Sequence, residues 1–323
     1  LASMPFEDLL EGNPPVRADA AVNHSIVQGV LFGFGPFGRR GWRGAFLDRF
    51  ATGHDSLYLR LRALLHAPAG TIASMRLALI LLVALPLCGW NETGHKTIAY
   101  VAYANLNKPV RIRVDALLRK HPDFAAWKGQ PFLEASYWPD VIRGNPRYDH
   151  PNWHYINVFF SPDGTPTPAS DYTGPSVLTK IGELRRTVPD TSLPEPERAI
   201  QLAWLLHLVA DVHQPVHAAS RCLQSLPQGD RGGNLTYVQG ASNLHSYWDG
   251  LLGSTPTEQF LTELGGDLMK TAPREKPVNP NERDWVDQSH RLAQERVYTF
   301  GHAPTTKDQP ALLPDTYQAA GRA

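Results

Sequence analysis

The sequence predicts a mostly α-helical, single-domain fold for residues 90–323, preceded by a segment of different character. Apolar residues recur three or four positions apart through most of this region, which is the period of amphipathic helices. Alternation of apolar and polar residues is sparse, and His154 to Phe160 is at most a short extended piece. The region is long enough to enclose one substantial core, and it contains no internal repeat.

The first expected helices come early in this region. His95 to Leu106 has apolar positions three and four apart, and Pro109 to Lys120 continues in the same style. Glu134 to Arg143 is expected to be a short helix interrupted by Pro139, since proline lacks the N–H that a helix interior uses.

The later helices follow the same period. Pro196 to His213 is the clearest of them, because one side of it is almost fully apolar. The others are Ser176 to Val188, Thr257 to Lys270 and Asp284 to Tyr298, and Leu312 to Ala323 resembles the first part of a further helix that is cut short. Loops rich in Pro, Gly and Asp separate these helices, notably Phe160 to Gly174 and Leu223 to Leu235.

Residues 75–89 have the pattern of a secretory signal peptide. Met75 and Arg76 form a short basic start, and Leu77 to Leu87 is almost wholly apolar. That run is well short of the ~20 residues that a membrane-spanning helix needs, which disfavours a membrane anchor. A lipoprotein site at Cys88 is disfavoured because the preceding leucine is larger than such sites usually allow. Residues 1–74 carry no chemical motif, and we interpret them as sequence upstream of the true start or as a leader without function.

Charge and cysteine content narrow the function class. Asp and Glu slightly outnumber Lys and Arg in residues 90–323, so the domain does not resemble a basic nucleic-acid coat. After removal of the leader, Cys222 would be the one remaining cysteine, and it cannot form an internal disulfide. An exported protein without disulfides fits a bacterial periplasm or medium.

Histidine and aspartate recur with the spacing of metal ligands. His207 and Asp211 stand four residues apart, so on a helix they point to one face, and His245 and Asp249 repeat the spacing. A proline after the first pair ends the helix and lets the chain present His217 as a further ligand. Imidazole and carboxylate suit zinc without any thiolate. These five side chains therefore predict a zinc site.

Two further observations sharpen this prediction. Asp211 lies on an otherwise apolar helix, where an unpaired carboxylate is costly to bury and a metal removes that cost. His213 lies between the ligands but points to another face, so we interpret it as structural. The remaining histidines of the domain have no partner pattern and are assigned no function: His121, His150, His290 and His302.

At this point the residues resemble a known family. The matching segments run in order along the chain: Trp90 to His95 (WNETGH), Ser136 to Asp140 (SYWPD), His154 to Ile156 after Trp153, His207 to His217, Gly229 to Asn234 (GDRGGN) and Asn243 to Asp249 (NLHSYWD). Together they resemble the S1/P1 nuclease family of zinc-dependent single-strand nucleases and 3′-nucleotidases, in a bacterial-type member. The resemblance implies the helical fold shared by P1 nuclease and zinc phospholipase C, with three zinc ions in a cleft.

The resemblance assigns ligands to each of the three zinc ions. One zinc takes Asp140, His154, His207 and Asp211; a second takes His217, His245 and Asp249; the third takes His95, Asp211 as a bridge, and the amino nitrogen and carbonyl oxygen of Trp90. Trp90 offers a free amine only if it is the first residue of the mature chain. Cleavage after Gly89, a small residue of the kind that signal peptidase prefers, would provide it. The uncleaved precursor is therefore expected to be inactive.

The resemblance also implies roles in catalysis. Zinc would lower the pKa of a bound water from ~15.7 towards ~7. Asp140 would orient that water and take its proton, and Arg143 would bind the phosphate. The alternative interpretation of Arg143 is a solvated charge on the helix surface. Asn157 and Asn234 fall at expected substrate-binding positions, although fungal and plant members have Asp at the position of Asn157 and carry disulfides. Base contacts inferred from those members are therefore not carried over.

The expected substrates are single-stranded DNA and RNA and 3′-nucleotides, and the expected protein is a secreted or periplasmic monomer without a membrane anchor. A zinc phospholipase C is the alternative enzyme, but the last ligand there is typically Glu, whereas Asp249 stands here. A zinc-storing or non-catalytic binding protein is the alternative from another class. It would not need Asp140 and Arg143.

Overall fold

The computed structural model describes residues 89–271, 281–301, 303–314 and 317, all of which belong to one compact unit. The expected leader and signal peptide lie outside the described residues, apart from Gly89. Within the described part, no helix combines the length and the apolar character that crossing a membrane requires.

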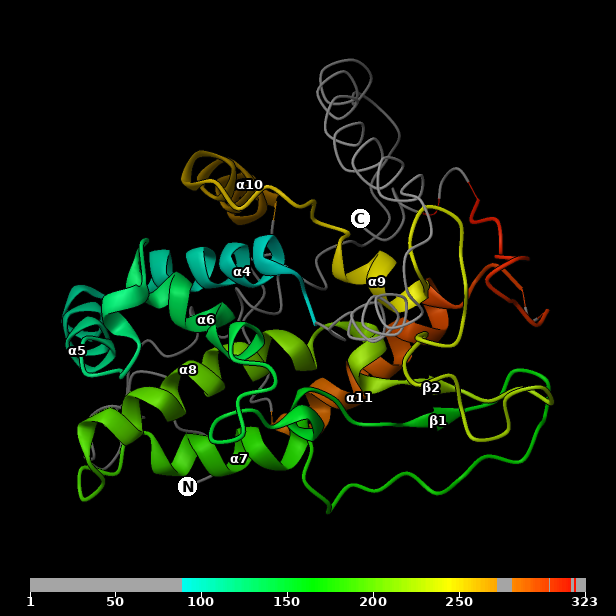
Figure 1. Cartoon of the computed structure of the whole chain (residues 1–323), viewed down its shortest axis with the longest axis horizontal. Coiled ribbons are helices and arrows are strands. Elements are labelled where there is room, and N and C mark those ends of the chain that lie inside the picture. The colour runs from blue at the N-terminus through cyan, green and yellow to red at the C-terminus, as the bar shows by residue number, and fades with distance from the viewer. Residues whose placement is uncertain (1–88, 272–280, 302, 315–316, 318–323) are drawn as a thin grey trace, which may run out of the picture. The chain divides into compact units, whose positions relative to one another are not determined.

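The described residues confirm the predicted mostly α-helical fold (Figure 1). The α-helices are α4 (Glu92–Asn105), α5 (Lys108–Leu118), α6 (Pro131–Val141), α7 (Val177–Thr187), α8 (Glu195–Val212), α9 (Leu244–Asp249), α10 (Glu258–Thr271) and α11 (Glu282–Leu292). Four shorter helical turns are η2 (Phe124–Ala126), η3 (Pro151–His154), η4 (Pro215–Ala218) and the π-helical η5 (Ala293–Val297). The two strands are β1 (Phe159–Phe160) and β2 (Ser220–Arg221), which pair in parallel.

Local chemistry explains where several helices begin. Asn91 caps α4 by accepting a hydrogen bond from the Gly94 N–H at 3.0 Å, and Thr179 Oγ1 accepts one from the Ser176 N–H at 3.1 Å at the start of α7. Both devices satisfy N–H groups that the first turn of a helix leaves without partners. Leu312 and Leu313 lie outside any helix, and the expected helix beyond them falls mostly outside the described residues.

Helix α6 differs from its prediction. It begins at Pro131 and continues through Pro139 to Val141 without interruption. Pro139 lies in the last turn, so the missing N–H removes a single hydrogen bond close to the end of the helix. The continuous helix keeps Asp140 on the side of α6 that packs against α8.

The larger hydrophobic core lies among α4 to α8. Helix α8 packs against α6 and α7, and α6 also packs against α4. Trp204 and Leu208 of α8 and Phe132 of α6 are almost completely buried in this core. Burying each such side chain contributes roughly 1.5–3 kcal/mol to stability. Because α8 is surrounded in this way, its polar residues are enclosed along with its apolar ones.

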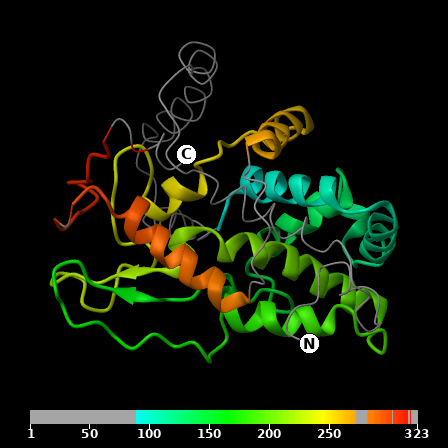
Figure 2. The same cartoon turned by 180° about the vertical axis from the view of Figure 1, so that it is seen from behind.

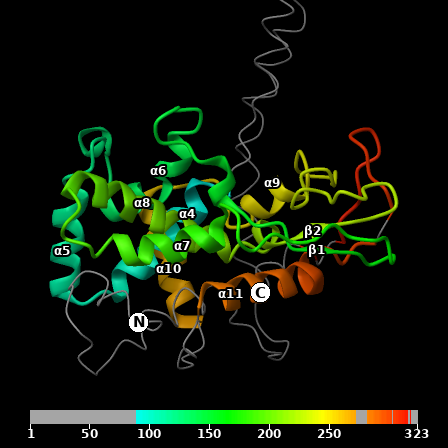
Figure 3. The same cartoon turned by 90° about the horizontal axis from the view of Figure 1, so that it is seen from below.

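A second hydrophobic cluster lies around α9, η4 and η5. It contains Trp90, Val216, Leu244, Trp248 and Val297. Helix α11 contacts η4 and α7; it is in the foreground of the view from behind (Figure 2) and runs along one edge in the view from below (Figure 3). The two clusters hold α8, η4 and α9 in place, and these three elements carry five of the predicted zinc ligands: His207, Asp211, His217, His245 and Asp249.

Candidate metal centre

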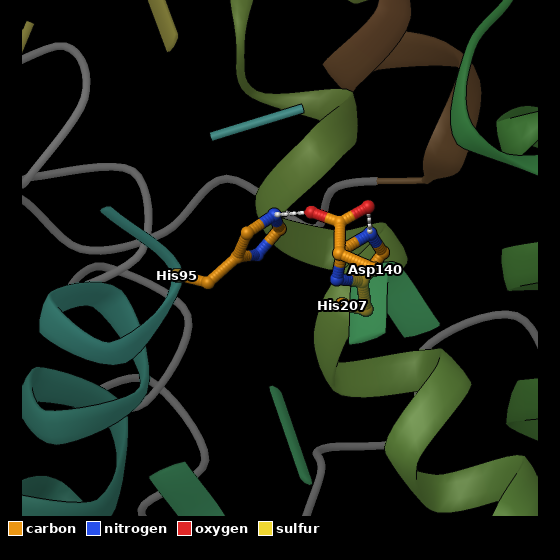
Figure 4. A group of neighbouring side chains, drawn as sticks. All are labelled: His95, Asp140 and His207. Carbon is orange, nitrogen blue, oxygen red and sulfur yellow. Dashed lines mark ion pairs between the residues drawn. The ribbon is translucent and has the colours of Figure 1, made fainter. Parts of the chain in front are cut away.

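The site is built on α8, where His207 and Asp211 lie on one face as their spacing predicts. Both side chains are fully buried, and His207 Nε2 lies 3.1 Å from Asp211 Oδ2. Two neighbouring helices each add a ligand candidate. His95 of α4 stacks on the His207 ring with a centroid separation of 4.0 Å. Asp140 of α6 approaches the Nε2 atoms of both rings, with its oxygens 3.9 Å from His95 Nε2 and 3.8 Å from His207 Nε2 (Figure 4).

His154 reaches the same place from η3. Its Nδ1 lies 3.0 Å from Asp211 Oδ2 and 2.9 Å from His207 Nε2. The indole of Trp204 packs edge-on against the His154 ring at 5.3 Å, which holds the imidazole from the core side. Ligand atoms of His154, His207 and Asp211 form one group within 4.8 Å of one another, and those of His95, Asp140 and His207 form another.

Asp211 joins the ligand candidates. Its Oδ2 faces His154 and His207, while its Oδ1 lies 3.5 Å from His95 Nε2 and 3.6 Å from His217 Nδ1. Burial raises the pKa of this carboxyl, but the neighbouring His207 ring and hydrogen bonds from His154 and His207 outweigh burial and hold the pKa well below its usual range. A charged carboxylate with four imidazoles around its two oxygens has the arrangement of a ligand that bridges two cations.

The third group consists of His217 on η4 and His245 and Asp249 on α9. His245 Nε2 lies 3.6 Å from Asp249 Oδ2. The His217 and His245 rings stack with a centroid separation of 4.9 Å. Burial raises the pKa of Asp249 well above its usual value. A cation bound next to this carboxyl would oppose the effect of burial and favour its charged form.

Backbone carbonyls orient three of the histidines. The Nδ1 atoms of His207, His217 and His245 lie 2.8, 2.7 and 2.7 Å from the carbonyl oxygens of Ser136, His154 and Gly232, respectively. Each Nδ1 therefore carries the proton, and each Nε2 is left with a lone pair for a metal, as second-shell partners do in zinc proteins. Gly232 has a φ of +63° and Gly233 a φ of +84°, which explains the glycine pair in this loop.

The donor set fits a group of bound metal ions. Several buried polar atoms at the centre have no hydrogen-bond partner among the described residues: both ring nitrogens of His95, Asp140 Oδ2, His154 Nε2, Asp211 Oδ1 and His217 Nε2. Burial lowers the pKa values of His95, His154 and His217, so these rings are neutral, the state in which imidazole binds a metal. Unpaired buried groups are costly, and cations would satisfy them together.

The amino end of Trp90 lies at the same centre. Its ring is buried in the second hydrophobic cluster, and the Asn91 N–H that follows it donates to the Asp249 carbonyl at 3.1 Å. The preceding residue, Gly89, lies so close that an added Cβ atom would collide with Asp211 Oδ1 and would be 2.7 Å from His217 Cε1. The peptide before Trp90 therefore occupies space beside the Asp211 carboxylate.

Arg143 is part of the site. Its side chain is 18% exposed, and its Nη2 lies 2.7 Å from Asp140 Oδ1. Its Nε also donates to the same oxygen at 2.8 Å. This two-nitrogen contact holds the guanidinium beside the carboxylate predicted to be catalytic, in place of a solvated position on the helix surface.

The two predicted substrate-binding asparagines are not among these groups. Asn157 is half-buried, and no hydrogen bond of its side chain is found with the described residues. Asn234 donates to the Arg231 carbonyl at 2.8 Å and lies 3.4 Å from the Asn243 amide, so its side chain is engaged within its own loop.

Other histidines lie elsewhere. The His213 ring packs against Trp285, and its Nδ1 faces the Val209 carbonyl at 2.7 Å. His121 packs between Trp127 and Trp138. His150 stacks on Trp153 and His290 lies beside the Ala218 carbonyl, whereas His302 is outside the described residues.

One functional candidate was missed by the sequence analysis. Gln214 is completely buried, and its Nε2 donates to Asp249 Oδ1 at 2.7 Å. The sequence did contain a sign of this role. Gln214 lies between His213 and Pro215, within the segment His207 to His217 whose spacing had already indicated metal binding.

Comparisons with known proteins agree with this geometry. The sequence model of the family described as S1/P1 Nuclease matches residues 90–323. Nuclease P1 of Penicillium citrinum is 25% identical over 166 residues, covering 50% of this chain and 57% of that protein. Nuclease S1 of Aspergillus oryzae is 24% identical over 165 residues, covering 50% and 53%. Endonuclease 3 of Arabidopsis thaliana is 26% identical over 200 residues, covering 57% and 61%. The matched part therefore spans less than two thirds of each relative.

Proposed function

Because the chain belongs to the S1/P1 nuclease family, we propose that it is a zinc-dependent phosphodiesterase that hydrolyses single-stranded DNA and RNA to 5′-nucleotides. We further propose that it acts as a 3′-nucleotidase. The observation that carries the proposal is the position of Asp211, whose two carboxylate oxygens face four buried imidazoles. This arrangement suits adjacent metal ions far better than it suits a hydrophobic core.

Three zinc ions per chain would account for the ligand candidates. We propose one ion held by Asp140, His154, His207 and Asp211 and a second held by His217, His245 and Asp249. The third would be held by His95, Asp211 and the amino nitrogen and carbonyl oxygen of Trp90. The support is that ligand atoms of His154, His207 and Asp211 converge within 4.8 Å, as do those of His217, His245 and Asp249. For the third ion, His95 Nε2 lies 3.5 Å from Asp211 Oδ1, and Gly89 places the amino end of Trp90 beside Asp211.

The charge of the site supports a need for bound cations. Asp140, Asp211 and Asp249 each contribute a carboxyl group to the site, and Arg143 pairs with one of them, Asp140. Such a cluster would repel an anionic phosphodiester by itself. When bound, zinc would supply a positive field for the phosphate and lower the pKa of a water molecule.

The residues of the chain would then orient the reactants. Asp140 is in position to accept a proton, because its Oδ2 has no hydrogen-bond partner while Arg143 holds its Oδ1. Arg143, held against Asp140, would bring its guanidinium charge close to a phosphate group of the substrate. Buried His207 and Asp211 are held rigidly by α8, so they would keep this geometry through the reaction.

We also propose that the mature protein begins at Trp90 and is exported as a monomer. Export rests on the basic and apolar pattern of residues 75–89. A mature start at Trp90 rests on its buried amino end beside Asp211. The proposal implies that signal cleavage completes the metal centre.

A substrate panel tests the proposed function. Zinc-loaded protein that begins at Trp90 should hydrolyse single-stranded DNA, RNA and 3′-AMP in preference to a phosphatidylcholine analogue. Asp140→Asn should lower the rate by at least about 100-fold, as loss of a general base does, which controls for a contaminating nuclease. A zinc-loaded protein that cleaves the lipid analogue alone would identify a phospholipase C-type enzyme, and one inert on every substrate would identify a binding protein.

A further inference from the structure

We infer that Gln214 is a positioning residue that presents Asp249 to a metal ion through a single oxygen. The inference rests on the proposed metal centre and concerns the pocket formed by His217, His245 and Asp249. It assigns a role to a side chain that is not itself a ligand.

The orientation of the Gln214 amide is determined by its partners. Its Oε1 lies 2.8 Å from the backbone nitrogen of Val216, which can only donate a hydrogen bond. The oxygen of the amide must therefore face Val216, and the NH₂ group must face Asp249, where Nε2 lies 2.7 Å from Oδ1. The side chain is completely buried, so water does not compete for either contact.

This contact leaves one oxygen of Asp249 for a metal. Oδ1 is occupied by the amide, whereas Oδ2 faces His245 Nε2 at 3.6 Å. Asp249 is thereby directed to bind through Oδ2 alone. A carboxylate free to use both oxygens would bind a cation in a different geometry and with a higher coordination number.

Gln214 is also the residue that connects three ligands. Its backbone N–H donates to the Asp211 carbonyl at 2.9 Å, and its carbonyl accepts from the His217 N–H at 2.9 Å. Its side chain completes the connection by holding Asp249 on α9, 35 residues away in the sequence. The turn between α8 and η4 thus aligns the bridging carboxylate, one imidazole and the more distant carboxylate.

Within this pocket, the contact can be removed without altering a ligand. His217 and His245 are oriented by the backbone carbonyls of His154 and Gly232. Replacing the side chain of a residue does not remove its backbone carbonyl. Asp249 is oriented by a side chain. Outer-shell partners of this kind change metal affinity by about 10- to 100-fold when they are lost.

The test uses Gln214→Glu at pH 8 in protein that begins at Trp90. Glutamate keeps an oxygen to accept from the Val216 N–H but replaces the donor facing Asp249 with a second, negatively charged oxygen. Gln214→Leu removes both the donor facing Asp249 and the acceptor facing the Val216 N–H, without adding charge. Gln239→Glu is the matched control, because it makes the same chemical change at an exposed position.

Affinities are measured by zinc competition with a chelator, and geometry by the visible absorption of the cobalt-substituted proteins. Both Gln214 variants should bind one of the three ions about 10- to 100-fold more weakly, with a changed cobalt spectrum, while Gln239→Glu matches the parent protein. If Gln214 serves only to hold the turn, Gln214→Glu will retain the parent affinity and spectrum, and the inference is overturned. Should Gln214→Glu fail to fold, the zinc affinity and cobalt spectrum of Gln214→Leu take its place, and parent values of both would overturn the inference.

These readings are separate from nuclease activity. A parent protein that binds three zinc ions yet cleaves no nucleic acid would contradict the proposed function and leave the role of Gln214 intact. Unchanged metal binding in a folded Gln214 variant would contradict the role of Gln214 and leave the proposed function intact.

Discussion

Asp211 and His213 lie only two positions apart at the end of α8, yet their surroundings differ completely. The Asp211 carboxylate faces four imidazoles, whereas the His213 ring packs on Trp285 and faces a backbone carbonyl. The helix period separates them onto different faces, as the sequence predicted.

Substitution of these two residues should therefore have unequal effects. Asp211→Asn removes the charge that we propose bridges two cations, so we expect zinc content to fall and turnover on single-stranded DNA to drop at least about 100-fold. His213→Ala should cost some stability but leave metal content unchanged. Elemental analysis and rates on folded proteins check this. Equal losses of zinc in both variants would mean that the site does not depend on this helix face.

His121 is a titratable group outside the metal centre, with a consequence for stability. It is 3% exposed and accepts from the Asp123 N–H at 3.1 Å. Burial lowers its pKa from 6.5 to about 4, with a smaller opposing effect from Asp123. The unfolded chain therefore binds a proton more readily than the folded one, so this contribution to stability is present above pH 6.5 and is lost as the pH falls towards 4.

The lower pKa of His121 in the folded protein than in the unfolded chain predicts that the free energy of unfolding falls by roughly 2 kcal/mol between pH 8 and pH 5, at 1.36 kcal/mol per pKa unit. His121→Phe fills the space between Trp127 and Trp138 without titrating, so it should lack this part of the pH dependence. Urea unfolding of both zinc-loaded proteins at the two pH values measures the difference, since the contribution of the metal ligands is common to both. Parallel losses in the two proteins would show that His121 is not the titrating group.

At the scale of elements, the loop after β2 is built to support His245. Asp230 is fully buried and accepts hydrogen bonds from the backbone of Arg221 and Gly233 and from the hydroxyls of Thr236 and Tyr298. These contacts fix the loop in the left-handed turn that directs the Gly232 carbonyl to His245 Nδ1.

Two glycines of this region offer a matched comparison. Gly232 and Gly240 both have positive φ angles, +63° and +87°, so alanine at either position costs about 1–2 kcal/mol of strain. A Cβ atom at Gly232 would also collide with the Val216 carbonyl, whereas none of the described atoms lies within 4 Å at Gly240. Gly232→Ala should therefore weaken zinc binding as well as lower the melting temperature, and Gly240→Ala should lower the melting temperature alone. Identical zinc affinities would exclude a role for the loop in metal binding.

The elements also show what the sequence could and could not predict. The pairing of His207 with Asp211 followed from helical spacing, because both lie on one element. The approach of His95, Asp140 and His154 depends on how α4, α6 and η3 pack, and no local spacing encodes that; the family resemblance alone brought them together. The predicted interruption of α6 at Pro139 was wrong, because the energetic cost of a proline depends on how near it lies to the end of the helix. Gln214 was overlooked because its role depends on a contact with a residue on another helix.

At the scale of the whole molecule, the metal centre lies where two hydrophobic clusters meet. Trp204 and Leu208 belong to one cluster, and Trp90, Val216 and Trp248 belong to the other. Ligand candidates come from α4, α6, η3, α8, η4 and α9, so bound ions would cross-link elements spread over most of residues 90–249. Binding to the folded state alone stabilises that state, which couples zinc to folding.

A three-zinc centre completed by the amino end of Trp90 is tested most directly by the zinc content of the protein. Protein that begins at Trp90 is prepared beside a form with one extra glycine before it, the amino termini are verified by mass spectrometry, and zinc per chain is measured by elemental analysis. We expect about three ions in the first form and about two in the second, because the extra residue converts the chelating amine into an amide. One zinc or fewer in the form that begins at Trp90 would contradict the three-zinc centre, and equal zinc content in both forms would contradict the role of Trp90.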